Sequence, residues 1–170
     1  MITAIQDMDV AGKRLVVRAD LNVPMVDGRV TDATRIIRFA GGMKRLLAKG
    51  ASLVILSHFG RPRGGFEAAL SLRHVRDDLS GALGCPVAFA KLDDASEAAR
   101  GLAPGQVLLV ENIRFETGEE KNDPALAARL AQLGDIYVND AFSCAHRAHA
   151  STEAIARLMP SAAGPLMMEE

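Results

Sequence analysis

The chain has 170 residues, of which 49% are apolar and 24% charged, and its formal net charge is −1. This composition predicts one globular domain and argues against a general nucleic-acid or membrane-surface binder, because those proteins usually carry a basic excess. No apolar run approaches the roughly 20 residues that span a bilayer. Cys85 and Cys144 have no CxxC spacing, and residues 1–10 do not resemble a signal peptide, so we expect a reduced, cytoplasmic protein.

Short apolar runs that are typical of buried strands alternate along the chain with segments of helical spacing. The expected strands are residues 15–19, 53–57, 87–89, 107–110 and 136–138. The expected helices are residues 31–50 with Thr31 as N-cap, 71–84 with Ser71 as cap, 95–103, 123–133, and 155–159 after a polar loop at 139–151. This alternation predicts an α/β fold: a single Rossmann-like, three-layer domain with a parallel sheet and helices on both faces.

Polar side chains, most of them arginine or histidine, follow the ends of these strands. In a parallel sheet the carboxyl ends share one edge, where open α/β sheets bind ligands. Arginine binds carboxylate and phosphate groups through its planar, bidentate guanidinium. The sequence therefore predicts a site for a small phosphorylated hydroxy acid, and it contains no glycine-rich nucleotide-phosphate loop. The candidate residues are Asp20, Asn22, Arg35, His58, Arg61, Arg114, His146 and Arg147.

Each of these residues also has an ordinary structural interpretation. Arg35 or Arg114, taken alone, is more often a solvated surface charge. Asp20 could cap a turn, and His58 could be a histidine that is hydrogen-bonded at the end of a strand. His146 and His149 have a spacing that could ligate a metal on a helix, but no cysteine or carboxylate set accompanies them, so no metal site is predicted.

Four blocks of sequence resemble phosphoglycerate kinase, and they occur in the same order as in that family. The match begins near Gly12 and covers the amino-terminal, phosphoglycerate-binding half of such an enzyme, so residues 1–170 are expected to be that domain without the carboxyl-terminal nucleotide-binding domain. The blocks are residues 18–24 (RADLNVP), 57–62 (SHFGRP), 111–115 with 118–121 (ENIRF, GEEK), and 138–142 with 145–152 (VNDAF, AHRAHAST).

The resemblance implies a role for each candidate residue. His58, Arg61, Arg114 and Arg147 would bind the phosphate end of 3-phosphoglycerate, and Asp20 and Asn22 its hydroxyl and carboxyl region. Arg35 would be catalytic, because it faces the carboxylate and the phosphoryl group in flight. The full substrate-binding set implied is Asp20, Leu21, Asn22, Arg35, His58, Phe59, Gly60, Arg61, Arg114 and Arg147.

The resemblance also implies a reaction of glycolysis and gluconeogenesis, in which a phosphoryl group passes reversibly between ATP and the carboxylate of 3-phosphoglycerate to give 1,3-bisphosphoglycerate. ATP and magnesium would be bound by the carboxyl-terminal domain, so the chain alone is expected to be inactive. One alternative is a non-catalytic anion-binding module, and another is a domain that assembles with a separately encoded ATP-binding lobe. Ser143 and Cys144 stand where many members have Gly-Thr, and we expect this departure to touch no ligand contact.

Overall fold

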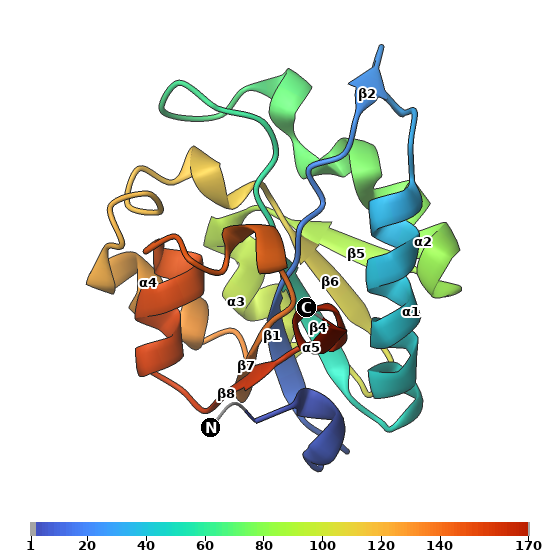
Figure 1. The fold of residues 1–170 in the computed structure, drawn as a ribbon. Helices are drawn as coiled ribbons and strands as arrows, with labels where there is room; N and C mark the ends of the chain where they lie inside the picture. Colours follow the sequence, from blue (N-terminus) through green and yellow to red (C-terminus); the bar gives the residue numbers. More distant parts are fainter. Residues whose placement is uncertain (1–2, 170) are drawn as a thin grey trace.

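The computed structural model describes residues 3–169, which form a six-stranded parallel sheet with helices on both faces (Figure 1). The strand order is β5-β6-β4-β1-β7-β8. These strands are β1 (Arg14–Arg18), β4 (Ser52–Leu56), β5 (Val87–Ala90), β6 (Val107–Val110), β7 (Ile136–Asn139) and β8 (Ser161–Ala163). The helices are α1 (Thr34–Ala48), α2 (Arg76–Leu83), α3 (Leu92–Arg100), α4 (Pro124–Ala131) and α5 (Pro165–Glu169). The expected α/β architecture is confirmed.

Alternate residues of each central strand belong to two separate apolar cores. In β1, Leu15 and Val17 pack with the helices α1 and α2, whereas Val16 packs with α3 and α4. This period of two is the one that a strand buried on both faces requires. The ribbon shows the same division, with α1 and α2 on one side of the sheet and α3 and α4 on the other (Figure 1).

Most of the expected elements lie within a few residues of their predicted bounds. Ser71 accepts a hydrogen bond from the backbone of Arg73 and so caps a 3₁₀ turn (Leu72–Val75) that leads into α2. Asp123 caps α4 by accepting from the backbone of Leu126, with Pro124 in the first turn. These local signals succeeded because each cap is satisfied within three residues of its own position in the chain.

Other predicted boundaries were wrong. Helix α1 starts at Thr34 rather than near Thr31, and it is the Asp32 carboxylate that accepts from the Thr34 backbone N–H at 3.0 Å. Helix α3 begins at Leu92, three residues before the prediction, because Leu92 already starts its buried stripe. The expected helix at 155–159 is replaced by a π turn (Ala150–Ala154) and a 3₁₀ turn (Ile155–Arg157), which begin inside the predicted loop.

Four of the strands and helices lie outside the prediction. The short strands β2 (Met25–Val26) and β3 (Arg29–Val30) form a hairpin whose turn has positive φ at Asp27 and Gly28, as a mirror-image turn requires. Strand β8 extends the sheet beyond β7, and α5 then packs against α1. The chain around Thr3 covers the outer edge of β8, since the Thr3 carbonyl accepts from the Ala163 N–H.

Candidate functional site

The loops that follow β1, β4, β6 and β7 come together at one edge of the sheet. Strand β1 continues into α1 on one face, whereas β7 continues into the helical turns at 150–157 on the other face. Connections that diverge in this way leave a crevice at the carboxyl ends of the two neighbouring strands. The crevice is therefore a consequence of the strand order.

This crevice contains a cavity of about 320 Å³ lined mainly by polar side chains. Four arginines and a histidine surround it with a single carboxylate, so the charge on its walls is positive. The lining residues are Asp20, Asn22, Arg35, His58, Gly60, Arg61, Arg114, Ser143, Cys144 and Arg147.

Asp20, Arg35 and Ser143 form a hydrogen-bonded group on one wall. The Asp20 carboxylate accepts from Arg35 Nη1 at 3.2 Å and from Ser143 Oγ at 2.5 Å. Burial raises the pKa of Asp20, but the hydrogen bonds from Ser143 and the Asn22 backbone, together with the Arg35 charge, outweigh it and hold that pKa below its ordinary value. Arg35 also donates Nη1 to the Asn22 carbonyl at 2.8 Å, so one end of a half-exposed guanidinium is fixed.

His58 follows β4 and contacts Arg18, an arginine that does not line the cavity. Arg18 Nη2 lies 3.0 Å from His58 Nδ1. A guanidinium has no acceptor, so Nδ1 must accept this hydrogen bond and the ring proton must lie on Nε2. Burial and the nearby charges of Arg18 and Arg114 lower the pKa of His58 to about 3, which makes the ring neutral at pH 7.

Arg114 follows β6 and reaches the cavity from the 3₁₀ turn Ile113–Phe115. Asn112 caps this turn and also bonds both backbone groups of Phe59, at 3.2 and 2.7 Å, so it ties the loops after β4 and β6 together. Arg114 donates Nη1 to the Gly60 carbonyl at 3.2 Å, while its Nε and Nη2 are buried and have no partner within residues 3–169. Burial also lowers the pKa of Arg114. Two buried donor atoms without a partner on a cation at the cavity wall would be satisfied by an anion that reached them.

The structure brings most of the predicted residues together. Asp20, Asn22, Arg35, His58, Gly60, Arg61, Arg114 and Arg147 all line the cavity. Leu21 and Phe59 do not, because their side chains pack in the core, although the Leu21 N–H donates to Ser57 Oγ and Phe59 is held by Asn112. His146 is exposed and its ring lies at 6.3 Å from that of Phe142.

Sequence reasoning missed two lining residues and one internal contact. Ser143 donates a hydrogen bond to Asp20, and Cys144 Sγ lies 3.8 Å from His58 Nδ1. The expectation that these two positions touch no ligand contact was therefore wrong, because both line the cavity beside candidate residues. Arg18 was not among the candidate residues, and it is wholly buried against His58. Its position at the end of a strand that is buried on both faces was the one feature of the sequence that could have indicated its burial.

Two further findings concern metal binding and membrane spans. Residues 3–169 hold no group of three or more His, Cys, Asp or Glu side chains arranged to bind a metal. None of the helices described is both long enough and apolar enough to cross a membrane.

Residues 5–170 match the family model for phosphoglycerate kinase. The chain belongs to the phosphoglycerate kinase family. It is 61% identical to the phosphoglycerate kinase of Rhodospirillum centenum and 56% identical to that of Ruegeria pomeroyi, over 98% of the chain in both comparisons. The structure of phosphoglycerate kinase from Coxiella burnetii resembles it with a TM-score of 0.90 at 38% identity, over 99% of the chain, and that from Pyrococcus horikoshii with 0.87 at 30%, also over 99%.

The chain spans less than half of these relatives. It covers 43% and 42% of the two sequences and 43% and 44% of the two structures. The family and the fold are therefore established for residues that make up less than half of the longer phosphoglycerate kinases.

Proposed function

We propose that the cavity is the 3-phosphoglycerate half-site of a phosphoglycerate kinase. Three guanidiniums and a neutral imidazole, from Arg61, Arg114, Arg147 and His58, supply donors for the phosphate end of the substrate. Asp20 and Asn22 supply acceptor and amide groups for its hydroxyl and carboxyl end. In this proposal Leu21 and Phe59 shape the site through their backbone, which Ser57 and Asn112 hold, because their side chains are buried in the core, and Gly60 lines the cavity.

Arg35 is the catalytic residue in this proposal. Asp20 and the Asn22 carbonyl hold its Nη1, which leaves the rest of an exposed guanidinium to face the substrate carboxylate and the incoming phosphoryl group. Both reactants are anionic, so the transfer needs their charges neutralised and their atoms aligned. In related phosphoryl transfers an arginine in this position contributes about 10³–10⁵ in rate.

The other substrate is assigned outside this chain. We assign ATP and its magnesium to the part of the longer relatives that these residues do not span, and we assign that part as the domain partner of this one. The chain alone then binds 3-phosphoglycerate but does not transfer phosphoryl groups. Closure of the second domain would add contacts and exclude water, so we expect the isolated site to bind weakly.

The observation that carries the proposal is the joint placement of four arginines and one neutral histidine around a cavity at the sheet edge, in a member of this family. Calorimetric titration with 3-phosphoglycerate tests it, with sulfate and citrate as competitors at matched ionic strength. We expect saturable one-to-one binding that neither competitor displaces at equal concentration.

Three outcomes would contradict parts of this proposal. Equal displacement by sulfate or citrate would indicate a generic anion-binding module. ATP turnover by the chain alone, in an assay coupled to the consumption of 1,3-bisphosphoglycerate, would contradict the assignment of ATP elsewhere. Activity restored when the chain is mixed with the remaining part of a relative as a separate protein would favour the alternative of a domain that assembles with a separately encoded ATP-binding lobe.

A further inference from the structure

Arg18 is a buried cation whose side chain touches the site without lining it. It is 0% exposed at the end of β1, and it is not among the residues that line the cavity. Its Nη1 donates to the Ala19 carbonyl at 2.6 Å and its Nε to Ser151 Oγ at 2.9 Å, while Nη2 faces His58 Nδ1. A buried charge is costly unless it is paired and hydrogen-bonded, so these contacts need an explanation.

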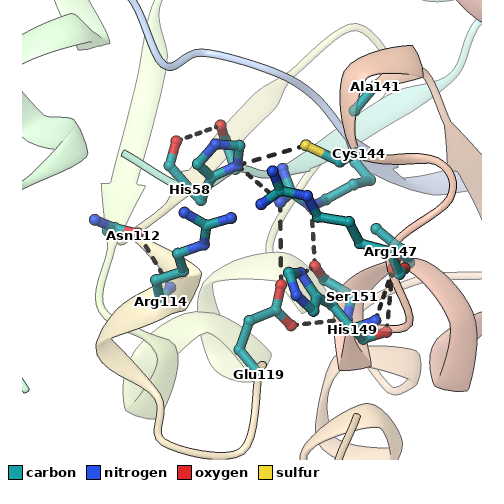
Figure 2. Close-up of polar contacts among 12 residues, drawn as sticks. His58, Asn112, Arg114, Glu119, Ala141, Cys144, Arg147, His149 and Ser151 are labelled. Atoms are coloured by element: carbon teal, nitrogen blue, oxygen red, sulfur yellow. Dashed lines mark hydrogen bonds and ion pairs between the residues drawn. The ribbon is translucent and has the colours of Figure 1, made fainter. Parts of the chain in front are cut away.

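Glu119 and Ser151 account for the position of this guanidinium. The Glu119 carboxylate, also 0% exposed, accepts from the Ser151 N–H at 2.8 Å and from Ser151 Oγ at 2.5 Å (Figure 2). It lies 4.0 Å from Arg18 Nη2. A serine hydroxyl has one proton. Because Glu119 takes that proton, Ser151 Oγ presents a lone pair to Arg18 Nε.

The hydrogen bonds diverge from Arg18: its Nη2 donates to His58 Nδ1, while its Nε donates to Ser151 Oγ, which donates in turn to Glu119. The four residues come from four separate segments: Arg18 ends β1, His58 follows β4, Glu119 follows the 3₁₀ turn Ile113–Phe115, and Ser151 lies in the π turn Ala150–Ala154. His58 Nδ1 therefore receives a hydrogen bond and Nε2 keeps the proton. His58 Nε2 has no partner in the described residues and is not among their buried unpartnered atoms, so it is the ring nitrogen that is open to the cavity.

We propose that Glu119 and Ser151 are positioning residues, which hold Arg18 so that it fixes His58 in the tautomer that donates Nε2–H to the bound anion. The inference rests on the proposed function, because it assigns His58 to the phosphate end of 3-phosphoglycerate. It adds two residues that lie outside the cavity and act through a third.

The surroundings of His58 explain why such a device is useful. The charged and titratable groups that face it are Arg18, Asp20, Arg114, Cys144 and Arg147. Three of these are cations, so an imidazolium is unfavourable here and the ring can serve an anion only as a neutral donor. A free neutral imidazole exchanges its proton between the two nitrogens, whereas a fixed guanidinium at Nδ1 leaves only one choice.

The test is the ¹⁵N NMR signature of the His58 ring in the 170-residue chain without ligand. In the wild type we expect an unprotonated Nδ1 and a protonated Nε2 from pH 5 to pH 8. Ser151→Ala removes the acceptor of Arg18 Nε, and Glu119→Gln removes the charge, so both should shift the two ring signals toward an average of the tautomers. A protonated Nδ1 in the wild type, or unchanged signals in the folded Ser151→Ala variant, would overturn the inference.

Ser71→Ala is the matched control. Ser71 is another buried serine whose hydroxyl donates to a buried carboxylate, that of Glu111 at 2.7 Å, but it has no contact with Arg18 or His58. This variant should lose stability and leave the His58 signals unchanged. If it shifts them as much as Ser151→Ala does, the effect is general loosening and the inference fails. Glu119→Gln leaves a buried cation uncompensated and is the riskier variant for folding, so the conclusion depends on Ser151→Ala.

A binding measurement separates this inference from the proposed function. Ser151→Ala should weaken 3-phosphoglycerate binding about tenfold, as expected for one hydrogen bond to a charged group. Arg61→Ala should weaken binding but leave the His58 tautomer fixed. If the wild type shows the fixed tautomer but does not bind 3-phosphoglycerate, the proposed function fails and the positioning role of Glu119 and Ser151 stands. If the wild type binds 3-phosphoglycerate but its His58 ring exchanges between the two tautomers, the proposed function stands and the positioning role of Glu119 and Ser151 fails.

Discussion

Asp140 is a buried carboxyl group whose titration should control stability near neutral pH. It follows β7 and is 2% exposed, its Oδ1 accepts from the Leu166 N–H at 2.7 Å, and its Oδ2 has no partner among residues 3–169. Burial raises the pKa of Asp140 to about 7, although the backbone N–H groups of Leu166 and Met167 act against the rise. Replacing it by asparagine keeps the shape and an acceptor oxygen but removes the titration.

The sign of the effect follows from the two states of the carboxyl group. In the unfolded chain Asp140 releases its proton near pH 3.8, whereas in the folded chain it keeps the proton until about pH 7. Through this group the folded state binds more protons across this window, so the contribution of Asp140 to stability falls as the pH rises through it. The difference between the two values corresponds to about 4 kcal/mol at pH 8. We expect Asp140→Asn to be more stable than the wild type by up to about 4 kcal/mol at pH 8 and similar to it at pH 4.

Urea unfolding followed by circular dichroism measures this difference, since the chain has no tryptophan for fluorescence. Asp27→Asn is the control, because Asp27 is an exposed aspartate in a turn with positive φ that asparagine also adopts. The free energy of unfolding of Asp27→Asn should follow that of the wild type at every pH. If the Asp140→Asn and wild-type values stay parallel between pH 4 and pH 8, the reasoning about this carboxyl group is refuted.

Three further results are expected. Arg61→Ala should weaken 3-phosphoglycerate binding by about 1.5–3 kcal/mol, because Arg61 lines the cavity, whereas Arg63→Ala in the same loop should not; equal losses in calorimetry would indicate only a basic surface. His58→Gln should retain more affinity than His58→Ala, since glutamine can also accept from Arg18 and donate into the cavity, and equal affinities would contradict a donor role. The pKa of His58 lies below its unfolded value, so the contribution of this group to stability should fall as the pH drops from 6.5 toward 3, opposite in sign to that of Asp140; a constant difference in unfolding free energy between the wild type and His58→Gln over this range would exclude it.

The sequence was sufficient for features that depend on neighbouring residues or on strand periodicity. The central strands, the caps at Ser71 and Asp123, and the polar residues after each strand could be predicted, because parallel strands bring their carboxyl ends to one edge. Strand β8 could not, since three residues of modest apolarity become a strand only by pairing with β7. Helix α1 begins after Thr31 because the Thr31 N–H bonds the Pro24 carbonyl within the preceding hairpin.

The candidate site divides in a similar way. Residues that point into the cavity carry a pattern that sequence can show, because arginine and histidine recur after the strands. The residues that support them do not: Arg18 and Glu119 are separated by 101 positions, and nothing local indicates that two charged side chains are buried together. Ser143 is similar, because its contact with Asp20 joins loops 123 residues apart.

The most direct test of the central claim is an NMR titration of the chain with 3-phosphoglycerate, with sulfate at matched ionic strength as the control. We predict saturable shifts that are larger than those caused by sulfate at residues of both walls of the cavity, Asn22 and Arg35 on one and His58, Arg61, Arg114 and Arg147 on the other. Equal shifts with the two anions, or shifts confined to the arginines, would contradict the claim that this cavity is a selective half-site for the substrate.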